Sequence, residues 1–400
     1  MTLEVRPVEG EEELRAFARV HATAFGHRWE DDKLENVILP WLPQVHAIAA
    51  FDGGTIVGVS VDQPFEMTLP GGRMAPMRGI TWVGVLPTHR RRGALRAMIE
   101  HQHAAFREAG LAFSALFASE TTIYGRFGYG PATALAAEAD IDTRHGRFAV
   151  PFTDSGSMVI LEEPEPFTVV REVIDRARLG IPGEIDRMDQ DITDGFKVAD
   201  RAEFRVAHRD AEGRWDGYAA YTIAEHWEHD ALPANRVKVG ALLSATTEAH
   251  AALWRYLLDI PLVRTVVVGN RPLDDPIRWL LAEWRYYRVR HVVDGLWVAL
   301  LDLPAALQAR GYLTDGEVVL AVDGTRYLVQ AGAGEGRCLP TDREPEIELG
   351  ASTLASVFLG GYRFTALREG MRLRELVPGA CVRADALFRA ERDPWCSYGF

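Results

Sequence analysis

Three arginines and a glycine that follow an apolar strand could together bind a diphosphate. The Val-Gly-Val-Leu sequence of residues 83–86 predicts a strand, Arg90, Arg91 and Arg92 follow it, and Gly93 precedes a helix. Arginine offers forked donors to phosphate, and the free N–H groups at a helix start attract anions. A strand rich in β-branched residues can also pair with an extended ligand through its main chain. The alternative is a solvated basic turn that begins an ordinary amphipathic helix.

The predicted helix after Gly93 holds this loop in place. Apolar side chains recur at helical spacing from Leu95 to Phe106, and Gly110 predicts the helix end. The loop has neither the glycine-framed lysine of a Walker loop nor the glycine triplet of a dinucleotide-binding fold. It resembles the pyrophosphate loop of the GNAT acetyltransferases, with Arg90 and Gly93 in the first and fourth places. Leu95 stands where that pattern prefers a small residue.

Tyr124 is the first candidate for acid–base chemistry. It lies in a short helix predicted over residues 120–127, one strand after the arginine loop. In a fold of this kind that helix lies beside the thioester sulfur, where a phenol can give its proton to a departing thiolate. With ordinary pKa values of about 8.5 for a thiol and about 10 for tyrosine, the transfer is uphill by about 2 kcal/mol. The alternative is an aromatic side chain that only packs this turn.

The C-terminal segment is the second candidate, because it ends in aromatic residues: Trp395, Tyr398 and Phe400. Aromatic side chains prefer burial, and a buried Phe400 would carry its α-carboxylate into a pocket. Desolvation would raise the carboxylate pKa from about 3.5, so that it could act as a base through a bridging water. It would also attract a substrate ammonium group. The alternative is a docked tail that only stabilises the last domain.

Bulk composition limits the function classes. Four hundred residues, of which 48% are apolar and 25% charged, predict two or three globular domains. The formal charge of −13 argues against nucleic acid as a partner and fits a cationic substrate, or simply solubility. We expect a cytoplasmic protein without a signal peptide, membrane span or disulfide, because apolar runs are short and only three cysteines occur. No spacing typical of a metal site is found, so no metal is expected.

The order of the predicted elements indicates an α/β, or α+β, protein of three domains. Residues 1–145 combine strands with helices in the order of a GNAT domain, and the strand over 134–141 is expected to close it. Residues 146–291 repeat a strand, loop, helix and strand, but Thr247 and Glu248 replace the arginines, which predicts a degenerate GNAT-like domain. Residues 292–400, including a strand at 295–300, resemble the sterol carrier protein fold.

This domain order resembles the enhanced intracellular survival (Eis) family of acetyltransferases. The strings Pro-Thr-His-Arg-Arg-Arg-Gly, Ile-Tyr-Gly-Arg-Phe-Gly-Tyr-Gly and the terminal Tyr-Gly-Phe carry the likeness. It implies that Tyr124 is the general acid and the α-carboxylate of Phe400 the general base. It further implies an acetyl-CoA groove in which the strand pairs with pantetheine, the Val85 N–H polarises the thioester carbonyl and the arginine loop holds the pyrophosphate. The implied groove residues are Val83, Gly84, Val85, Arg90, Arg91, Arg92, Gly93, Ala94, Leu95, Arg96, Ser119 and Glu120.

The implied function is direct N-acetylation of small polycationic amines, notably aminoglycosides, by a homohexamer. Phe25, Trp29 and Trp41, with the acidic residues 30–32 between them, could line an amine pocket, or could form a partly packed helix edge. Two rival functions stay open. One is a lipid or hydrophobe carrier that works through the last domain, and the other is an acyl-CoA-binding regulatory protein without turnover.

Overall fold

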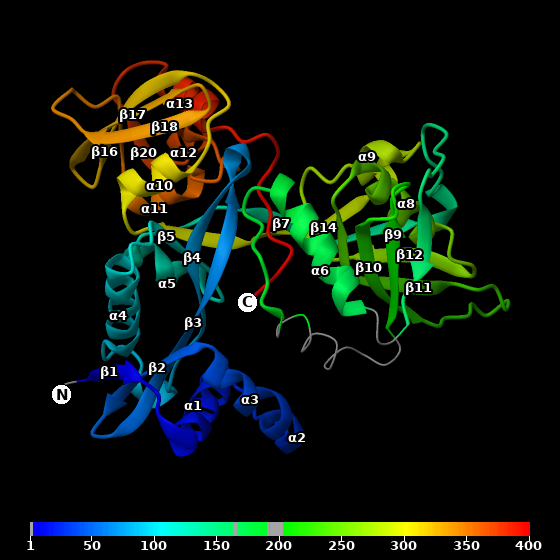
Figure 1. Cartoon of the computed structure of the whole chain (residues 1–400), viewed down its shortest axis with the longest axis horizontal. Helices are drawn as coiled ribbons and strands as arrows, with labels where there is room; N and C mark the ends of the chain where they lie inside the picture. The colour runs from blue at the N-terminus through cyan, green and yellow to red at the C-terminus, as the bar shows by residue number, and fades with distance from the viewer. Residues whose placement is uncertain (1–2, 163–165, 190–191, 193–202) are drawn as a thin grey trace.

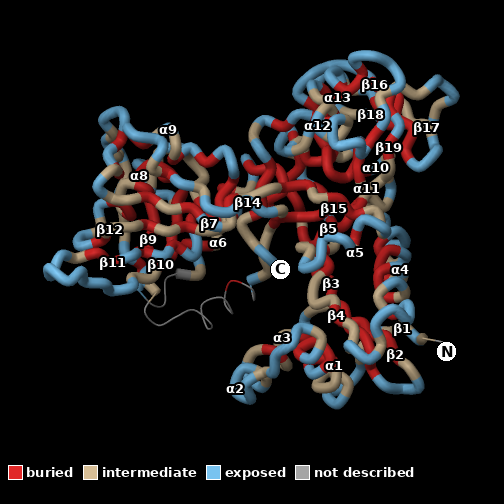
Figure 2. Tube along the Cα trace, turned by 180° about the vertical axis from the view of Figure 1, so that it is seen from behind, coloured by how far each residue is buried: buried red, intermediate tan, exposed pale blue. Residues whose placement is uncertain are grey.

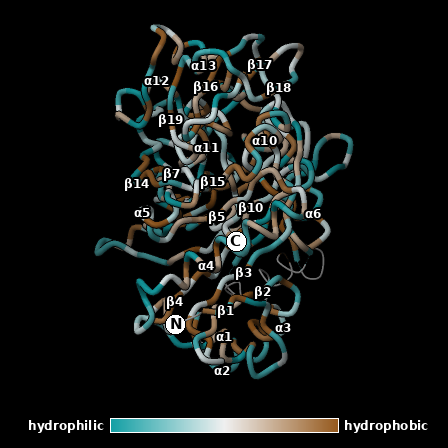
Figure 3. The backbone as a smooth tube through the Cα atoms, turned by 90° about the vertical axis from the view of Figure 1, so that its left-hand side faces the viewer, coloured by the Kyte–Doolittle hydropathy of each residue, from teal (hydrophilic) through white to brown (hydrophobic). Residues whose placement is uncertain are grey.

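A computed structural model describes residues 3–162, 166–189, 192 and 203–400 of the chain. It contains two large mixed sheets and a smaller sheet with helices packed around it (Figure 1). Among the described residues, no helix is both long enough and apolar enough to cross a bilayer. The C-terminus lies between the two large sheets (Figure 1) and near the middle of the molecule in the side view (Figure 3), rather than at the outer end of the last domain.

The first sheet has a helix on each face. Its strand order is β1 (Glu4–Pro7), β2 (His46–Asp52), β3 (Thr55–Leu69), β4 (Arg73–Val85), β5 (Phe113–Phe117), β15 (Leu296–Leu300) and β6 (Tyr129–Pro131). Helix α1 (Gly10–Ala24) buries Phe17 against Val59 and Val61 of β3. Helix α4 (Ala94–Glu108) buries Met98 on the opposite face, against Val57. The short helices α2 (Asp31–Lys33), α3 (Leu39–Trp41) and α5 (Thr121–Tyr124) complete this part.

The second sheet repeats the plan of the first. From one edge, its order is β8 (Ser157–Ile160), β9 (Phe204–Arg209), β10 (Trp215–Ala224), β11 (Asn235–Ser244), β12 (Val263–Val268) and β7 (Ala134–Asp142), with β13 (Arg271–Pro272) and β14 (Arg288–Asp294) both pairing with β7. Helix α6 (Pro166–Ala177) and helix α8 (Thr247–Leu258) pack on its two faces, and α9 (Ile277–Leu280) follows β13. The predicted internal repeat is therefore present in the strand order.

The two sheets exchange one strand each, and this corrects two expectations. Residues 134–141 were expected to close the first sheet, but β7 pairs with β12 in the second sheet. Residues 295–300 were expected in the last domain, but β15 pairs with β5 and β6 in the first sheet. Strand β15 lies next to β5, which pairs in parallel with β4, and strand β7 lies next to β12, which pairs in parallel with β11. The two exchanged strands therefore occupy the same position in their sheets. The pattern of apolar and polar residues within a strand cannot reveal this exchange, because a strand with that pattern fits equally well in either sheet. Figure 2 shows the buried run at β15.

The last domain packs one five-stranded sheet against short helices. Its elements are β16 (Gly316–Val322), β17 (Thr325–Gly332), β18 (Glu335–Pro340), β19 (Ile347–Leu349), β20 (Leu373–Glu375), α10 (Leu303–Ala309), α11 (Ala351–Val357), α12 (Phe364–Glu369) and α13 (Ala380–Phe388). Arg310 is fully buried and donates to the carbonyls of Phe358 at 2.6 Å and Phe388 at 2.7 Å. A buried cation thus satisfies carbonyls at the ends of α11 and α13 that would otherwise lack donors.

Candidate active site

Strands β4 and β5 separate in the middle of the first sheet. They pair in parallel only from Arg78–Ser114 to Ile80–Leu116, whereas β4 continues to Val85. The edge of β4 beyond Ile80 therefore faces an opening rather than β5, and we call this opening the first fork. An exposed strand edge offers main-chain donors and acceptors to an extended ligand.

A β-bulge turns the main chain of β4 at this fork. Val59 pairs with Gly84 and Val61 with Thr81, so Ser60 faces both Trp82 and Val83. Trp82 has a φ of 54°, a conformation that costs a bulky residue about 1–3 kcal/mol and is concentrated at functional sites. Sequence reasoning predicted a regular strand here and missed the bulge, since nothing in a Val- and Trp-rich strand signals it.

The arginine loop leads directly into an uncapped helix start. Arg91 and Gly93 both have left-handed backbones, with φ of 63° and 92°, and α4 begins at Ala94. The first main-chain bond of the helix runs from Ala97 N to Gly93 O, and no side chain caps this end. The N–H groups of residues 94–96 therefore point out of the helix start, beside the exposed guanidinium groups of residues 90–92.

An ion pair links the two sides of the fork. Arg90 Nη2 lies 3.0 Å from Glu120 Oε1, and the side chains are 63% and 58% exposed. Ser119 and Glu120 thus lie across the opening from the arginine loop, where the sequence analysis expected them to complete a groove. A pair this exposed contributes at most about 1 kcal/mol, so an anionic ligand can take over Arg90 at little cost.

Tyr124 is buried beside the fork. It packs in the cluster that contains Ile80, Leu116 and Tyr129, and its side chain belongs to α5. Burial, with a smaller contribution from the Glu120 charge, raises the pKa of Tyr124 to about 12. The free protein therefore does not show the lowered pKa that would ease proton transfer. The raised pKa instead keeps the phenol in its neutral, proton-donating form.

Phe400 reaches the same fork from the opposite face of the sheet. Its ring lies 4.8 Å from the ring of Phe65 on β3 and 5.2 Å from that of Phe117 on β5. It covers Gly79, the neighbour of Ile80 in β4. Successive residues of a strand face opposite sides. The two predicted catalytic residues therefore flank β4 at consecutive positions, one on each side. Sequence reasoning did not find Gly79, Phe65 or Phe117.

An aromatic cluster stands next to the bulge. Trp29 and Trp41, two of the predicted pocket residues, lie 5.6 Å and 4.9 Å from Trp82, measured between ring centroids. His21 stacks on Trp82 at 4.0 Å, and burial followed by the charge of His27 lowers its pKa to about 4. The exposed acidic residues 30–32 lie on the same segment as Trp29. The cluster combines π-faces with carboxylates, as a site for ammonium groups would.

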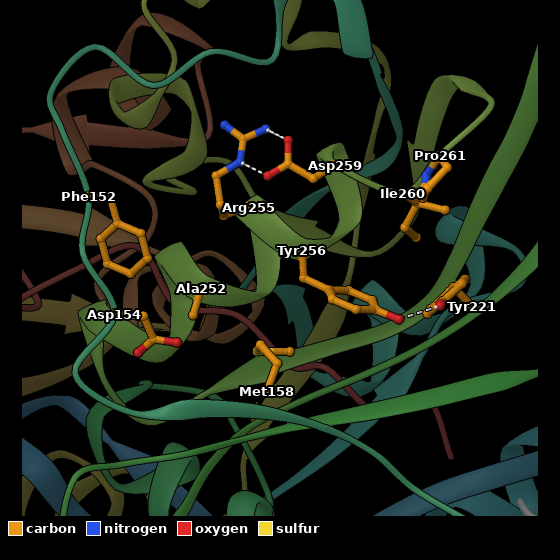
Figure 4. Close-up of a pocket in the computed structure, with 10 residues that line it drawn as sticks. All are labelled: Phe152, Asp154, Met158, Tyr221, Ala252, Arg255, Tyr256, Asp259, Ile260 and Pro261. Carbon is orange, nitrogen blue, oxygen red and sulfur yellow. Dashed lines mark hydrogen bonds and ion pairs between the residues drawn. The ribbon is translucent and has the colours of Figure 1, made fainter.

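A separate hollow lies beside α8, between it and strands β8 and β10 of the second sheet, and shares none of these residues (Figure 4). Its polar groups bond one another: Tyr221 and Tyr256 hydroxyls are 2.8 Å apart, and Arg255 pairs with Asp259 at 2.6 Å. Nothing predicted from sequence falls here.

Comparison with known proteins gives the same domain order as the structure. Models of the acetyltransferase (GNAT) domain match residues 4–132 and 183–299, and a sterol carrier protein domain model matches residues 303–397. N-acetyltransferase Eis of Mycobacterium tuberculosis is 36% identical over 353 residues, 85% of this chain and 84% of that protein. The chain belongs to the Eis family of GNAT N-acetyltransferases.

Two further relatives support this family assignment. The crystal structure of Eis1 from Mycobacterium abscessus matches with a TM-score of 0.88 at 30% identity, covering 99% of this chain and 100% of that one. An uncharacterized N-acetyltransferase of Streptomyces griseus is 33% identical over 87% of both chains. The Eis-type fold of two GNAT domains and a sterol carrier domain is therefore confirmed, as is an acyltransferase activity.

Proposed function

We propose that this Eis-type enzyme transfers the acetyl group of acetyl-CoA directly to an amine of small polycationic molecules, aminoglycosides among them. The proposal depends on one observation: Tyr124 and Phe400 flank the opening between β4 and β5. The family resemblance adds the expectation of a homohexamer, which light scattering of the purified protein tests.

The groove fits acetyl-CoA. The unpaired edge of Val83, Gly84 and Val85 suits an extended pantetheine arm, and the Val85 N–H would polarise the thioester carbonyl. The diphosphate fits the free N–H groups of the α4 start and the guanidinium groups beside them. The proposed groove keeps the residues expected from the sequence: Arg90, Arg91, Arg92, Gly93, Ala94, Leu95 and Arg96, with Ser119 and Glu120 on the far side.

Each candidate residue then handles one proton. The neutral amine attacks the thioester carbonyl, and the terminal carboxylate of Phe400 accepts, directly or through one water, the proton that the nitrogen loses as the new C–N bond forms. Tyr124 gives its proton to the sulfur as the C–S bond breaks. From a phenol pKa of about 12 to an ordinary thiol, that transfer is uphill by about 5 kcal/mol. A sulfur buried in the fork has a raised thiol pKa for the same reason as the phenol, which reduces the difference.

Bound acetyl-CoA supplies an already activated acyl group, so no covalent enzyme intermediate is required. The aromatic cluster and the carboxylates of residues 30–32 supply a cation site next to the bulge. The net charge of −13 concentrates polycations at such a surface.

An amine panel tests the proposal. Thiol release from acetyl-CoA is followed with aminoglycosides, linear polyamines and neutral amines of similar size, and mass spectrometry identifies each product. We expect turnover that rises with the number of amines and falls with salt. Acetyl-CoA binding without product from any amine would favour the non-catalytic regulator. Co-purified lipid together with no acetyl-CoA binding would favour the carrier.

A further inference from the structure

The second sheet contains a fork of its own, built like the first. Strand β11 pairs in parallel with β12 only from Asn235–Val263 to Val239–Val268, and then continues to Ser244 paired with β10 but not with β12. The extra residue Gly240 makes a bulge in β11 at the point where the pairing ends. Strand β11 and helix α8 thus stand in the second sheet where β4 and α4 stand in the first.

This second fork has lost the means to hold a diphosphate. Thr246 caps α8 by accepting a hydrogen bond from Ala249 N at 3.1 Å, so the helix start is occupied by its own side chain. Glu248 adds a negative charge in the first turn and binds Ser155. An anionic ligand would meet repulsion here rather than guanidinium groups.

The chain's own C-terminal segment lies at the mouth of this fork. Trp395 and Ser397 line a second hollow together with residues 240–243 of β11, Gly269 and Asn270. Trp395 is 3% exposed and packs with Leu243, Tyr218 and the apolar face of α6. The segment therefore lies on the face of the second sheet that α6 covers, while the buried Arg271 donates to the Leu242 carbonyl on the open edge of β11.

Asn270 holds the segment by both ends of its amide. Its Nδ2 donates to the carbonyl of Ser397 at 2.9 Å, and its Oδ1 accepts from Trp395 Nε1 at 3.0 Å. Asn270 follows the end of β12 with a φ of 47°, a left-handed conformation that asparagine tolerates better than most residues. Asn270 therefore contacts one main-chain carbonyl and one indole N–H group of the tail.

A second pair of side chains completes the hold. Ser397 N donates to the buried carboxylate of Glu184 at 2.9 Å, and Arg187 Nη2 donates to Ser397 Oγ at 2.6 Å. Glu184 also connects the tail to the first sheet, because its main-chain carbonyl accepts a hydrogen bond from Thr68 N of β3 at 2.8 Å. Only two residues lie between the fixed Ser397 and Phe400, so at most about 10 Å of extended chain separates them.

We propose that the central domain clamps the C-terminal segment at the mouth of its fork, with Asn270 and Trp395 as positioning residues for the terminal carboxylate at the first fork. This inference rests on the proposed function, because it gives the carboxylate of Phe400 a catalytic task. The tail contacts both sheets: Trp395 and Ser397 lie at the second fork, and Phe400 lies over Gly79, beside the first.

Asn270→Gly tests the clamp without straining the fold, because glycine suits a left-handed backbone. We expect kcat to fall about tenfold through misplacement of the base, while the KM for acetyl-CoA stays within about twofold. Carboxypeptidase should release Phe400 from the variant faster than from the native enzyme. Asn270→Asp keeps only the acceptor for Trp395, so its kcat and its rate of Phe400 release should lie between those of the native enzyme and of Asn270→Gly. Tyr256→Phe is the matched control, since it loses a hydrogen bond of the same domain that does not touch the tail.

A double variant separates this inference from the proposed function. A short extension after Phe400 should lower kcat strongly in the native background, and its effect should be about tenfold smaller together with Asn270→Gly, because that variant has already lost this part of the carboxylate's contribution. If the extension alone has no effect, the base assignment fails. If the extension abolishes turnover but the two changes multiply independently, or if Asn270→Gly leaves both kcat and carboxypeptidase resistance intact, the clamp is overturned and the base assignment survives.

Discussion

The ring of Phe400 fills the space that any side chain at Gly79 would need. A Cβ at Gly79 would lie 2.6 Å from Phe400 Cε2 and 2.7 Å from Phe65 Cε2. The last residue of the chain is thereby seated on the strand that opens the first fork, more than three hundred positions earlier in sequence. Glycine is required here for close approach, since the position has an ordinary φ.

Gly79→Ala should therefore displace the C-terminal residue. We expect kcat to fall at least tenfold and stability to fall by about 1–3 kcal/mol, because the added methyl overpacks two aromatic rings. Steady-state kinetics and urea unfolding measure the two effects. Gly332→Ala in β17 is the control, because nothing lies within 4 Å of a Cβ there. Unchanged kcat in a folded Gly79→Ala enzyme would count against a catalytic Phe400.

Tyr124→Phe should lower kcat by about 10²–10⁴-fold and leave the Kd for acetyl-CoA nearly unchanged, because only a proton donor is removed. Burial raises the pKa of Tyr124 to about 12. The group therefore stays protonated through the alkaline range, and we expect no loss of kcat from its ionisation below pH 10. Stopped thiol-release assays from pH 6 to 10 check this. A decline of kcat near pH 8 that vanishes in Tyr124→Phe would contradict the raised pKa.

The elements that frame the first fork were predictable from sequence because their determinants are local. A strand, a run of arginines at 90–92, a glycine at 93 and an amphipathic helix are neighbours along the chain, and their types state what they bind. Tyr124 follows one strand later. The aromatic residues at the C-terminus gave their own signal, because aromatic side chains rarely end a chain without being buried.

What could not be predicted depends on contacts between distant segments. The exchange of β7 and β15 leaves each strand's alternation unchanged, so periodicity assigns them to the wrong sheet. Gly79, Asn270 and Glu184 have ordinary surroundings in sequence and gain their roles only when the tail crosses them. Trp82, in the bulge, stacks on His21, which lies far away in sequence on α1.

Arg90→Gln should weaken acetyl-CoA binding about tenfold, with a shallower dependence on salt, because one phosphate contact is lost. Isothermal titration at two salt concentrations measures this. Arg374→Gln is a matched control: Arg374 pairs with Glu348 at 2.9 Å in the last domain and is similarly exposed, at 73% against 63%. Equal Kd values for the Arg90 variant, the control and the native enzyme would show that this loop does not bind the diphosphate.

His21 should make the first domain sensitive to acid. Burial lowers its folded pKa to about 4 from an ordinary 6.5, so the unfolded chain binds the proton first as pH falls. The stability it contributes is complete above pH 6.5 and is lost progressively toward pH 4, by about 2 kcal/mol at pH 5.

His21→Phe keeps an aromatic ring on Trp82 and removes the titration, so its unfolding free energy should drop less between pH 7.5 and 5. Urea unfolding followed by tryptophan fluorescence reports on this cluster. His101→Phe serves as the control, since that side chain lies partly exposed on α4. The same pH dependence in the native enzyme and in His21→Phe would mean that His21 is free to protonate in the folded state.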